Sequence, residues 1–305
     1  GYALGVVLLV SLGDRYSARR QVTAQLGATA AALVSAGLAP TYAVHVALCL
    51  VAGAAVLLGS FIVGLFVVRT ALGALAEAIG WRAAVIACGV VVLALVPLSL
   101  RVSPAAAPSF PPAYRAILAT IPRVAAGSPT LRLMTGAHTL CFMAFIALWS
   151  SATPYAIDEL GLSIGAAALL GLAGLVGGVI TIIAAPAHGR VGVPRSLTIS
   201  IAAALAGVVA IAIAPASLPI AAAGLLLLSA GMSSEQVSTQ AVALASVAPE
   251  QGGRANTVYM GSTFLGGAFA SAVGASLAAA LGYQAVAVLG ALLIVSAASL
   301  ALIAH

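Results

Sequence analysis

The segment Gly13-Asp14-Arg15-Tyr16-Ser17-Ala18-Arg19-Arg20 lies between two apolar stretches, residues 1–12 and 22–39. Three arginines and one aspartate within eight residues predict a short loop that stays in water. Cytoplasmic loops of membrane proteins are enriched in Lys and Arg, so such a loop also orients the helices on either side of it. The chain has no lysine, and its twelve arginines therefore carry the whole topological signal.

The composition is that of a membrane protein. Of 305 residues, 63% are hydrophobic and 6% are charged, whereas about a quarter of the residues in a soluble domain are charged. The apolar runs approach the ~20 residues that a helix needs to cross a bilayer, and they do not alternate as β-barrel strands do. The sequence therefore predicts an all-α membrane protein whose main partner is the lipid bilayer.

The remaining composition excludes several other classes of function. The net charge of +6 indicates no nucleic-acid partner, because the arginines lie in loops between apolar segments and form no continuous basic face. Cys49, Cys88 and Cys141 each fall in an apolar segment without metal-ligand spacing, which is typical of small buried side chains. The sequence also has no phosphate-binding loop or nucleophile elbow. We expect no enzyme activity, no metal, and no cofactor beyond a proton gradient.

Apolar runs, punctuated by Gly and Pro, divide the chain into about eleven predicted spans. Their approximate bounds are 1–12, 22–39, 41–58, 60–80, 82–100, 132–156, 162–186, 196–214, 217–248, 255–281 and 284–304. The turns between them are marked by Pro40, Gly80-Trp81, Gly161, Pro215 and Gly282-Tyr283. The first residue already lies inside an apolar run, so we expect the natural chain to begin upstream.

Counting sides from the first loop places ten arginines on one face of the membrane. They are Arg15, Arg19, Arg20, Arg101, Arg115, Arg123, Arg132, Arg190, Arg195 and Arg254. Only Arg82 falls on the opposite face, and Arg69 falls inside a span. The positive-inside rule then predicts that the face with ten arginines, which includes loop 13–21, is cytoplasmic.

Residues 101–131 interrupt this rhythm with four prolines between positions 104 and 112. Tyr114, Ile117, Leu118 and Ile121 follow on one helical face, which predicts a short helix lying on the membrane surface. The predicted organisation is an incomplete N-terminal transmembrane half (1–100), a cytoplasmic linker (101–131) and a C-terminal half of six helices (132–305).

The two halves show the spacing of repeats. Arg15, Arg20 and Ala39-Pro40 match Arg190, Arg195 and Ala214-Pro215 at an offset of 175, whereas Gly59-Ser60, Gly64 and Gly80-Trp81 match Gly261-Ser262, Gly266 and Gly282-Tyr283 at an offset of 202. The offsets differ by 27, so the first half is shorter by 27 residues between Pro40 and Gly59. A loop and parts of its flanking helices are then missing, either by deletion or because residues were closed up in the numbering.

These features resemble the major facilitator superfamily. The charged loop is similar to the family's Gly…Asp-Arg-x-Gly-Arg-Arg loop, with Ser17 where glycine and Ala18 where arginine are common. Residues 254–267 and the turn Gly80-Trp81-Arg82 resemble its bacterial drug and metabolite efflux branch. The resemblance covers essentially the whole chain, starting inside the second family helix. It implies two pseudo-symmetric halves, normally of six spans each, in a multi-pass protein of the bacterial inner membrane; we expect a monomer.

The resemblance also implies a gate on the cytoplasmic side, where the acid of this loop helps to latch the two halves together. Asp14 takes that part here, and the other gate candidates are Gly13, Arg15, Arg19, Arg20, Arg190, Arg195, Arg254 and Asn256. The alternative is that the arginines of the loop only anchor the topology. One departure is that residues 69–74 replace the Gly-Pro-x-x-Gly-Gly run that proton antiporters of this superfamily often carry.

Arg69 is a candidate for substrate recognition. It lies eleven residues before Gly80, or about 16 Å along a helix, which places it close to the membrane midplane. A charge at that depth is costly and calls for an explanation. Either it binds an anion or pairs with a charge in a central cavity, or it packs against the carbonyl groups of a neighbouring helix.

Glu235 is the other main candidate, in the most polar stretch inside a span. A carboxylate in a low-dielectric cavity suits reversible protonation during transport, and Gln236 and Gln240 lie on one helical face where they could bind a substrate. His138 and Trp149, which share one predicted helix, could also face the cavity. The alternative for all of them is hydrogen bonding between helices.

Small residues at spacings of four indicate close helix packing. The candidates are Gly174, Gly178, Gly266, Gly267 and Gly274. The whole pattern predicts a secondary-active transporter that exports a small organic molecule by alternating access, in exchange for protons. Two alternatives stay open: an importer or facilitator on the same fold, or a membrane-embedded sensor or non-transporting fragment.

Overall fold

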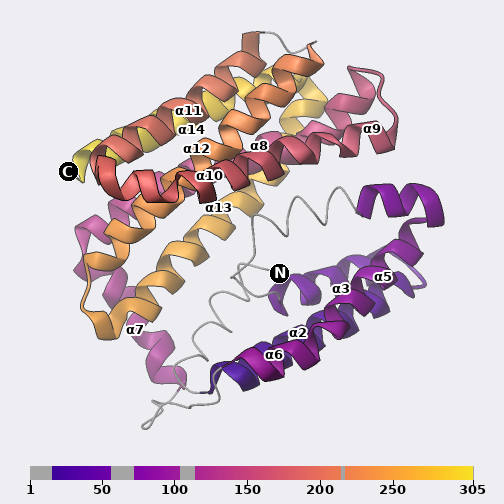
Figure 1. The fold of residues 1–305 in the computed structure, drawn as a ribbon, viewed down its shortest axis with the longest axis horizontal. Helices are drawn as coiled ribbons and strands as arrows, with labels where there is room; N and C mark the ends of the chain where they lie inside the picture. Colours follow the sequence, from indigo (N-terminus) through magenta and orange to yellow (C-terminus); the bar gives the residue numbers. More distant parts are fainter. Residues whose placement is uncertain (1–15, 56–71, 104–113, 214–216, 305) are drawn as a thin grey trace. The chain divides into compact units, whose positions relative to one another are not determined.

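The computed structural model describes residues 16–55, 72–103, 114–213 and 217–304, which contain helices joined by short turns and no strand (Figure 1). The chain divides into two compact units. Unit 1 comprises residues 1–61, 71–125 and 250–261, and unit 2 comprises residues 62–70, 126–249 and 262–305. The boundary at residue 125 falls inside the predicted linker.

Unit 1 is built around α2, which contacts both α3 and α5. Its helices are α2 (Ala18–Gly37), α3 (Tyr42–Ala55), α5 (Trp81–Ala94), α6 (Val96–Val102) and most of α7 (Tyr114–Gly127). Ser17 caps α2, since its hydroxyl accepts a hydrogen bond from the backbone amide of Arg20 over 3.4 Å.

Two hydrogen bonds tie the start of α2 to the end of α6. Arg19 Nε donates to the carbonyl oxygen of Ser103 over 3.1 Å, and the hydroxyls of Thr23 and Ser99 lie 3.2 Å apart. Arg19 and the last turn of α6, which carries Arg101, therefore lie at the same end of unit 1. This arrangement agrees with the even number of crossings that the arginine pattern predicts between these two residues.

Unit 2 is a bundle of long helices that run up and down in turn (Figure 1). They are α8 (Pro129–Asp158), the short α9 (Ile164–Ala168), α10 (Leu170–Val191), α11 (Val193–Ile213), α12 (Leu218–Ala245), α13 (Gly252–Leu281, from residue 262 in this unit) and α14 (Tyr283–Ile303). A 3-10 turn at Pro249–Gln251 precedes α13.

Contacts between helix ends fix the alternation in unit 2. Ser128 and Ser246 hydroxyls lie 2.8 Å apart, so α8 begins where α12 ends. At the other end, Glu159 Oε1 accepts a hydrogen bond from the amide of Tyr283, and so caps the start of α14. The basic ends of α8, α10 and α11, which carry Arg132, Arg190 and Arg195, accordingly lie at one end of the bundle.

The predicted spans that fall on the described residues are helical. Among those residues, seven helices are long and apolar enough to cross a membrane by length and composition: 81–102, 129–158, 164–184, 193–213, 218–245, 249–281 and 283–303. The predicted span 82–100 falls within 81–102, where Leu95 separates α5 from α6 and Pro97 lies in the first turn of α6. The predicted span 162–186 contains α9 and the start of α10, which together form the candidate span 164–184. The predicted span 1–12 and residues 60–71 lie outside the described residues.

The predicted surface helix at 114–121 is also longer than expected, since α7 continues through Pro122 to Gly127. Its basic side chains Arg115 and Arg123 are exposed, whereas Leu118 and Ile121 are half-buried. The predicted apolar face is therefore the more covered side of the helix.

Glycine makes two of the turns in the same way, as the repeat predicts. Gly80 (φ 83°, ψ 151°) precedes α5, and Gly282 (φ 81°, ψ 171°) precedes α14. These backbone angles are nearly closed to residues with a side chain. The two turns are 202 residues apart, and Gly192, directly before α11, has the same φ of 83°. The equivalence of the Gly80 and Gly282 turns therefore stays a prediction.

Close helix packing in unit 2 depends on residues without a side chain. A Cβ added at Gly266 would lie 2.6 Å from Thr139 Cγ2, and one at Gly274 would lie 2.9 Å from Ala147 Cα. The start of α13 in this unit therefore lies directly against α8. A Cβ added at Gly267 would likewise meet the Phe142 ring, at 2.6 Å from Cε1.

The closest contact of α10 with α12 is made by a glycine next to the two that the sequence predicts on α10. Gly174 and Gly178 are buried, but the tight contact is at Gly177, where a Cβ would lie 2.8 Å from the carbonyl oxygen of Leu226. Sequence analysis also missed Gly231, where a Cβ would lie 2.5 Å from backbone atoms of α11.

Replacing Gly231 by Ala is expected to destabilise the protein by about 1–3 kcal/mol, the usual range for overpacking a tight interior. The added methyl would meet Ser200 O and Ala204 N, which belong to the α11 backbone and cannot rotate away. Thermal unfolding of the detergent-solubilised chain measures the effect. Gly136→Ala is the control, because its nearest atom is the flexible end of Leu300 at 3.0 Å. Equal melting temperatures of the two variants would contradict this packing.

Candidate functional site

A hydrogen-bonded acid and base lie in the interior of unit 2. His138 Nδ1 and Glu235 Oε2 are 2.6 Å apart, and both side chains are 0% exposed. His138 belongs to α8 and Glu235 to α12, 97 residues later in the chain. The contact therefore joins two helices that sequence analysis treated separately.

A second bond fixes the same two helices at another level. Trp149 Nε1 donates to Ser229 Oγ over 3.2 Å, and the Ser229 hydroxyl donates in turn to the carbonyl oxygen of Leu225 over 2.7 Å. The two bonds are eleven residues apart on α8 and six on α12, or about 16 Å and 9 Å along each helix. Since they run in opposite directions along the chain, they hold the antiparallel pair in register.

Buried aromatic and aliphatic side chains lie near the acid–base pair on α8, whereas α12 carries the buried hydroxyls of Ser234, Ser238 and Thr239 around Glu235. The Phe142 ring lies 6.0 Å from the His138 ring between centroids, and Cys141 and Phe145 are buried on the same helix. Burying a charge in such a place is costly unless it is paired and hydrogen-bonded. His138 Nδ1 and Glu235 Oε2 meet this condition, because they are hydrogen-bonded to each other.

The second carboxylate oxygen of Glu235, Oε1, differs from Oε2 in its hydrogen bonding. Among the described residues, none provides a hydrogen bond to Glu235 Oε1, although this atom is buried. A carboxylate in hydrocarbon would be left with half of its acceptor capacity unmet, whereas a protonated carboxyl would need less. One oxygen of the Glu235 carboxyl group is therefore bonded to His138, and the other has no hydrogen-bond partner among the described residues.

The other polar residues predicted on these helices lie nearby on α8 and α12 but outside the pair. Gln236 and Gln240 are half-buried on α12, one and five residues after Glu235. Trp149 is 3% exposed and is held by Ser229, a partner that sequence analysis did not single out. Arg69 lies outside the described residues.

The gate candidates are at helix ends. Arg19 is bonded to Ser103, and Arg20, Arg190 and Arg195 are exposed. Arg254 Nη1 donates to Thr120 Oγ1 over 3.4 Å and Nη2 to the carbonyl oxygen of Glu250 over 3.5 Å, and Asn256 is half-buried. Gly13, Asp14 and Arg15 lie outside the described residues, so the predicted latch remains a prediction.

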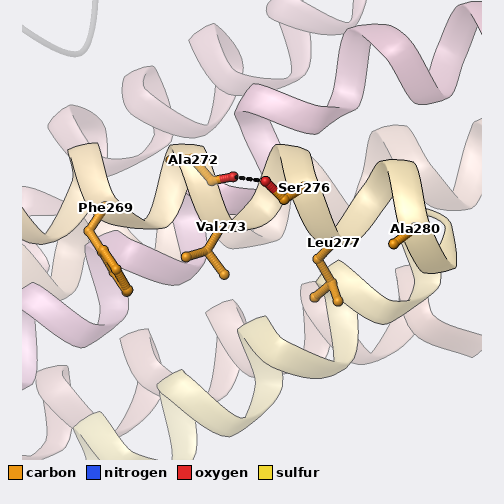
Figure 2. Close-up of a pocket in the computed structure, with 6 residues that line it drawn as sticks. All are labelled: Phe269, Ala272, Val273, Ser276, Leu277 and Ala280. Carbon is orange, nitrogen blue, oxygen red and sulfur yellow. Dashed lines mark hydrogen bonds between the residues drawn. The ribbon is translucent and has the colours of Figure 1, made fainter.

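A shallow groove runs along α13, separate from the acid–base pair. Figure 2 shows its lining, which comes from one helix: Phe269, Ala272, Val273, Ser276, Leu277 and Ala280. Its one hydroxyl, on Ser276, donates to the carbonyl oxygen of Ala272 over 2.9 Å and so offers little to a ligand. Phe269 is 64% exposed. The groove has the character of an apolar helix surface and carries no chemistry.

The chain matches the family model of the Major Facilitator Superfamily over residues 53–243, a range that includes both His138 and Glu235. The chain belongs to the Major Facilitator Superfamily. The all-α architecture is the fold of this family, as the sequence predicts. No individual curated protein matches the sequence.

Solved transporters of the superfamily share the fold. The structure is similar to FucP in the outward conformation, with a TM-score of 0.67 and 16% identity, covering 100% of this chain and 88% of FucP. It is also similar to a variant of the E. coli fucose:proton symporter FucP, with a TM-score of 0.65 and 16% identity. That match covers 100% of this chain and 89% of the FucP variant. The human organic anion transporter MFSD10 (TETRAN) is similar as well, with a TM-score of 0.66 and 18% identity, and the match covers 98% of this chain and 80% of MFSD10.

Replacing either member of the acid–base pair by leucine is expected to destabilise the protein by about 3–5 kcal/mol, because it leaves the other group buried without its partner. The double variant His138→Leu/Glu235→Leu should lose much less than the sum of the two single losses. Thermal unfolding of the four proteins in detergent completes the cycle. Additive losses would show that the two side chains do not depend on each other.

Proposed function

We propose that the chain is a secondary-active transporter of the bacterial inner membrane, which moves a small organic molecule by alternating access and is driven by protons. The observation that carries the proposal is the buried hydrogen bond between His138 and Glu235, which joins α8 to α12. The family supplies the transporter fold, and this pair supplies a group in its interior that can bind and release one proton.

The proton matters because it changes how firmly the two helices are joined. When the Glu235 carboxylate shares one proton with the His138 imidazole, which also keeps an N–H of its own, the pair has no net charge and the bond between α8 and α12 is intact. Removing that proton leaves a buried anion with fewer donors, and adding a second leaves a buried cation. Either change raises the free energy of this packing, so protonation can bias a two-state equilibrium of the transporter.

The substrate site is proposed beside the pair, near the membrane midplane where transporters of this kind bind their cargo. Gln236 and Gln240 provide neutral hydrogen-bonding groups on α12. Arg69 is the proposed recognition group should the substrate be an anion. A fold relative, MFSD10, is described as an organic anion transporter, which is consistent with an organic substrate but does not identify it.

Export is the proposed direction of transport, because residues 254–267 resemble the bacterial drug and metabolite efflux branch of the superfamily. Import has one observation in its favour, because the similar FucP is described as a fucose:proton symporter. A protein that neither exports nor imports would be a membrane sensor or a non-transporting fragment. The three possibilities differ in measurable ways.

Replacing Glu235 by Gln is expected to abolish the response of transport to a pH gradient, because Gln cannot exchange a proton while it keeps a similar shape. The measurement is flux into proteoliposomes containing the full chain, with fucose, fluorescein and ethidium as a sugar, an anion and a cation probe. Glu250→Gln is the matched control, since this carboxylate is exposed and outside the pair. Gradient-driven flux that survives in Glu235→Gln would reject the pair as the proton carrier.

The direction of coupling can be determined in the same vesicles. Under an imposed pH gradient, a proton antiporter moves its probe against the proton flow, whereas a symporter moves it with the flow. This difference holds for either orientation of the protein in the vesicle. We expect opposed movement; movement with the protons would establish the importer instead. Absence of flux and of counterflow for all probes would favour the non-transporting alternative.

A further inference from the structure

The three cysteines of the chain differ in their exposure. Cys49 is exposed, Cys88 is half-buried and Cys141 is buried. The prediction from the sequence that all three are small buried side chains is therefore wrong for Cys49. An exposed thiol can meet molecules from outside the protein, so the groups beside it decide how readily it reacts with them.

His45 lies one helical turn before Cys49 on α3 and is in contact with it. The His45 Nε2 and Cys49 Sγ atoms are 3.5 Å apart and form a hydrogen bond. The other ring nitrogen, Nδ1, lies 2.8 Å from the carbonyl oxygen of Ala36, near the end of α2. The imidazole therefore links the thiol to the backbone of a second helix.

These two contacts fix which nitrogen of the neutral His45 ring carries the hydrogen. A carbonyl oxygen has no hydrogen to donate, so Nδ1 is the donor to Ala36. Nε2 then has a free lone pair and accepts the hydrogen of the Cys49 thiol. A nucleophile, an adjacent base and a third group that orients the base form the arrangement that activates a nucleophile in enzymes.

Aromatic side chains surround the His45 ring at the start of α3 and α5. The ring centroids of His45 and Trp81 are 4.9 Å apart, with the rings nearly perpendicular, and Tyr42 stacks on His45 at 6.5 Å. The guanidinium of Arg82 lies 5.1 Å from the centroid of the Trp81 ring. Trp and Tyr are enriched where a membrane meets water, so this end of unit 1 is suited to meeting polar molecules.

We propose that Cys49 is a modification site that forms mixed disulfides with small disulfide molecules, with His45 as its base. The thiol hydrogen passes to His45 Nε2 while Cys49 Sγ attacks one sulfur of the disulfide, whose S–S bond breaks. The leaving sulfur then takes the proton from the imidazolium. One thiol and one disulfide give another thiol and another disulfide, so no further oxidant is needed. The proposal does not depend on the acid–base pair or on transport.

The rate of modification by glutathione disulfide tests this assignment. The full chain in nanodiscs is treated with the reagent, and mass spectrometry of its peptides follows each cysteine separately. Cys49 should react well before Cys88 and Cys141. His45→Ala should slow the reaction of Cys49 by about a hundredfold, the lower end of the range for a positioned base. Free imidazole should restore part of the rate in that variant, which a purely structural role of His45 does not predict.

A cysteine without a base beside it provides the matched control. Leu50 is 54% exposed on the same helix, and the residue one turn before it is Val46. The double variant Leu50→Cys/Cys49→Ser therefore carries an exposed thiol with no histidine at that spacing. We expect its thiol to react about as slowly as Cys49 does in His45→Ala.

Two results would overturn the proposal. The first is a rate in the Leu50→Cys/Cys49→Ser control equal to that of Cys49 in the unchanged chain, since exposure alone would then explain the reaction. The second is an unchanged rate in His45→Ala. If circular dichroism shows that His45→Ala loses helix content, the comparison of the unchanged chain with the control decides by itself.

Discussion

Lipid hydrocarbon offers no hydrogen bonds, and this constraint decides most of what the chain does. Backbone groups can satisfy one another only within helices, so every predicted span that lies on described residues is helical. Several side-chain hydroxyls bond to the helix that carries them, as Ser229 does to Leu225 and Thr239 does to Glu235. A carboxylate cannot be satisfied in this way, because it has no proton to donate to a carbonyl. Glu235 therefore needs a partner on another helix, and His138 is that partner.

The fold could be predicted from the sequence because the signals for it are local. Apolar runs, arginine placement and turn residues each report on a few neighbouring positions, and Gly80 and Gly282 adopt the same conformation that their spacing indicates. The amphipathic side of α7 was also predictable, since Leu118 and Ile121 share one face of the helix and are half-buried, whereas Arg115 and Arg123 are exposed. The acid–base pair was not. Helices α8 and α12 are apolar around most of their circumference, so their sequences do not reveal which side of each helix faces the other.

Glycine spacing shows the same limit. The chain has 32 glycines, and pairs four residues apart arise often at that frequency. The tight contact of α10 is at Gly177, next to the predicted Gly174 and Gly178, and a Cβ at Gly231 would lie 2.5 Å from the backbone of α11. Which glycine faces a neighbour depends on the rotation of both helices. Once these rotations are known, α12 is seen packed against α8, α10 and α11, which accounts for the burial of Glu235.

The partner of Glu235 is a histidine, and this residue type decides what the pair can do. An arginine in its place would stay charged under all conditions, so the pair could change only by protonation of the acid. A histidine can be neutral or charged, and the hydrogen bond of 2.6 Å can be kept with one proton shared between the two groups. The imidazole keeps an N–H of its own, so the shared proton gives a pair without net charge, whereas its loss or a further proton creates a net charge in the buried interior. An arginine suits a permanent structural bridge, whereas a histidine is the residue type that the proposed proton coupling requires.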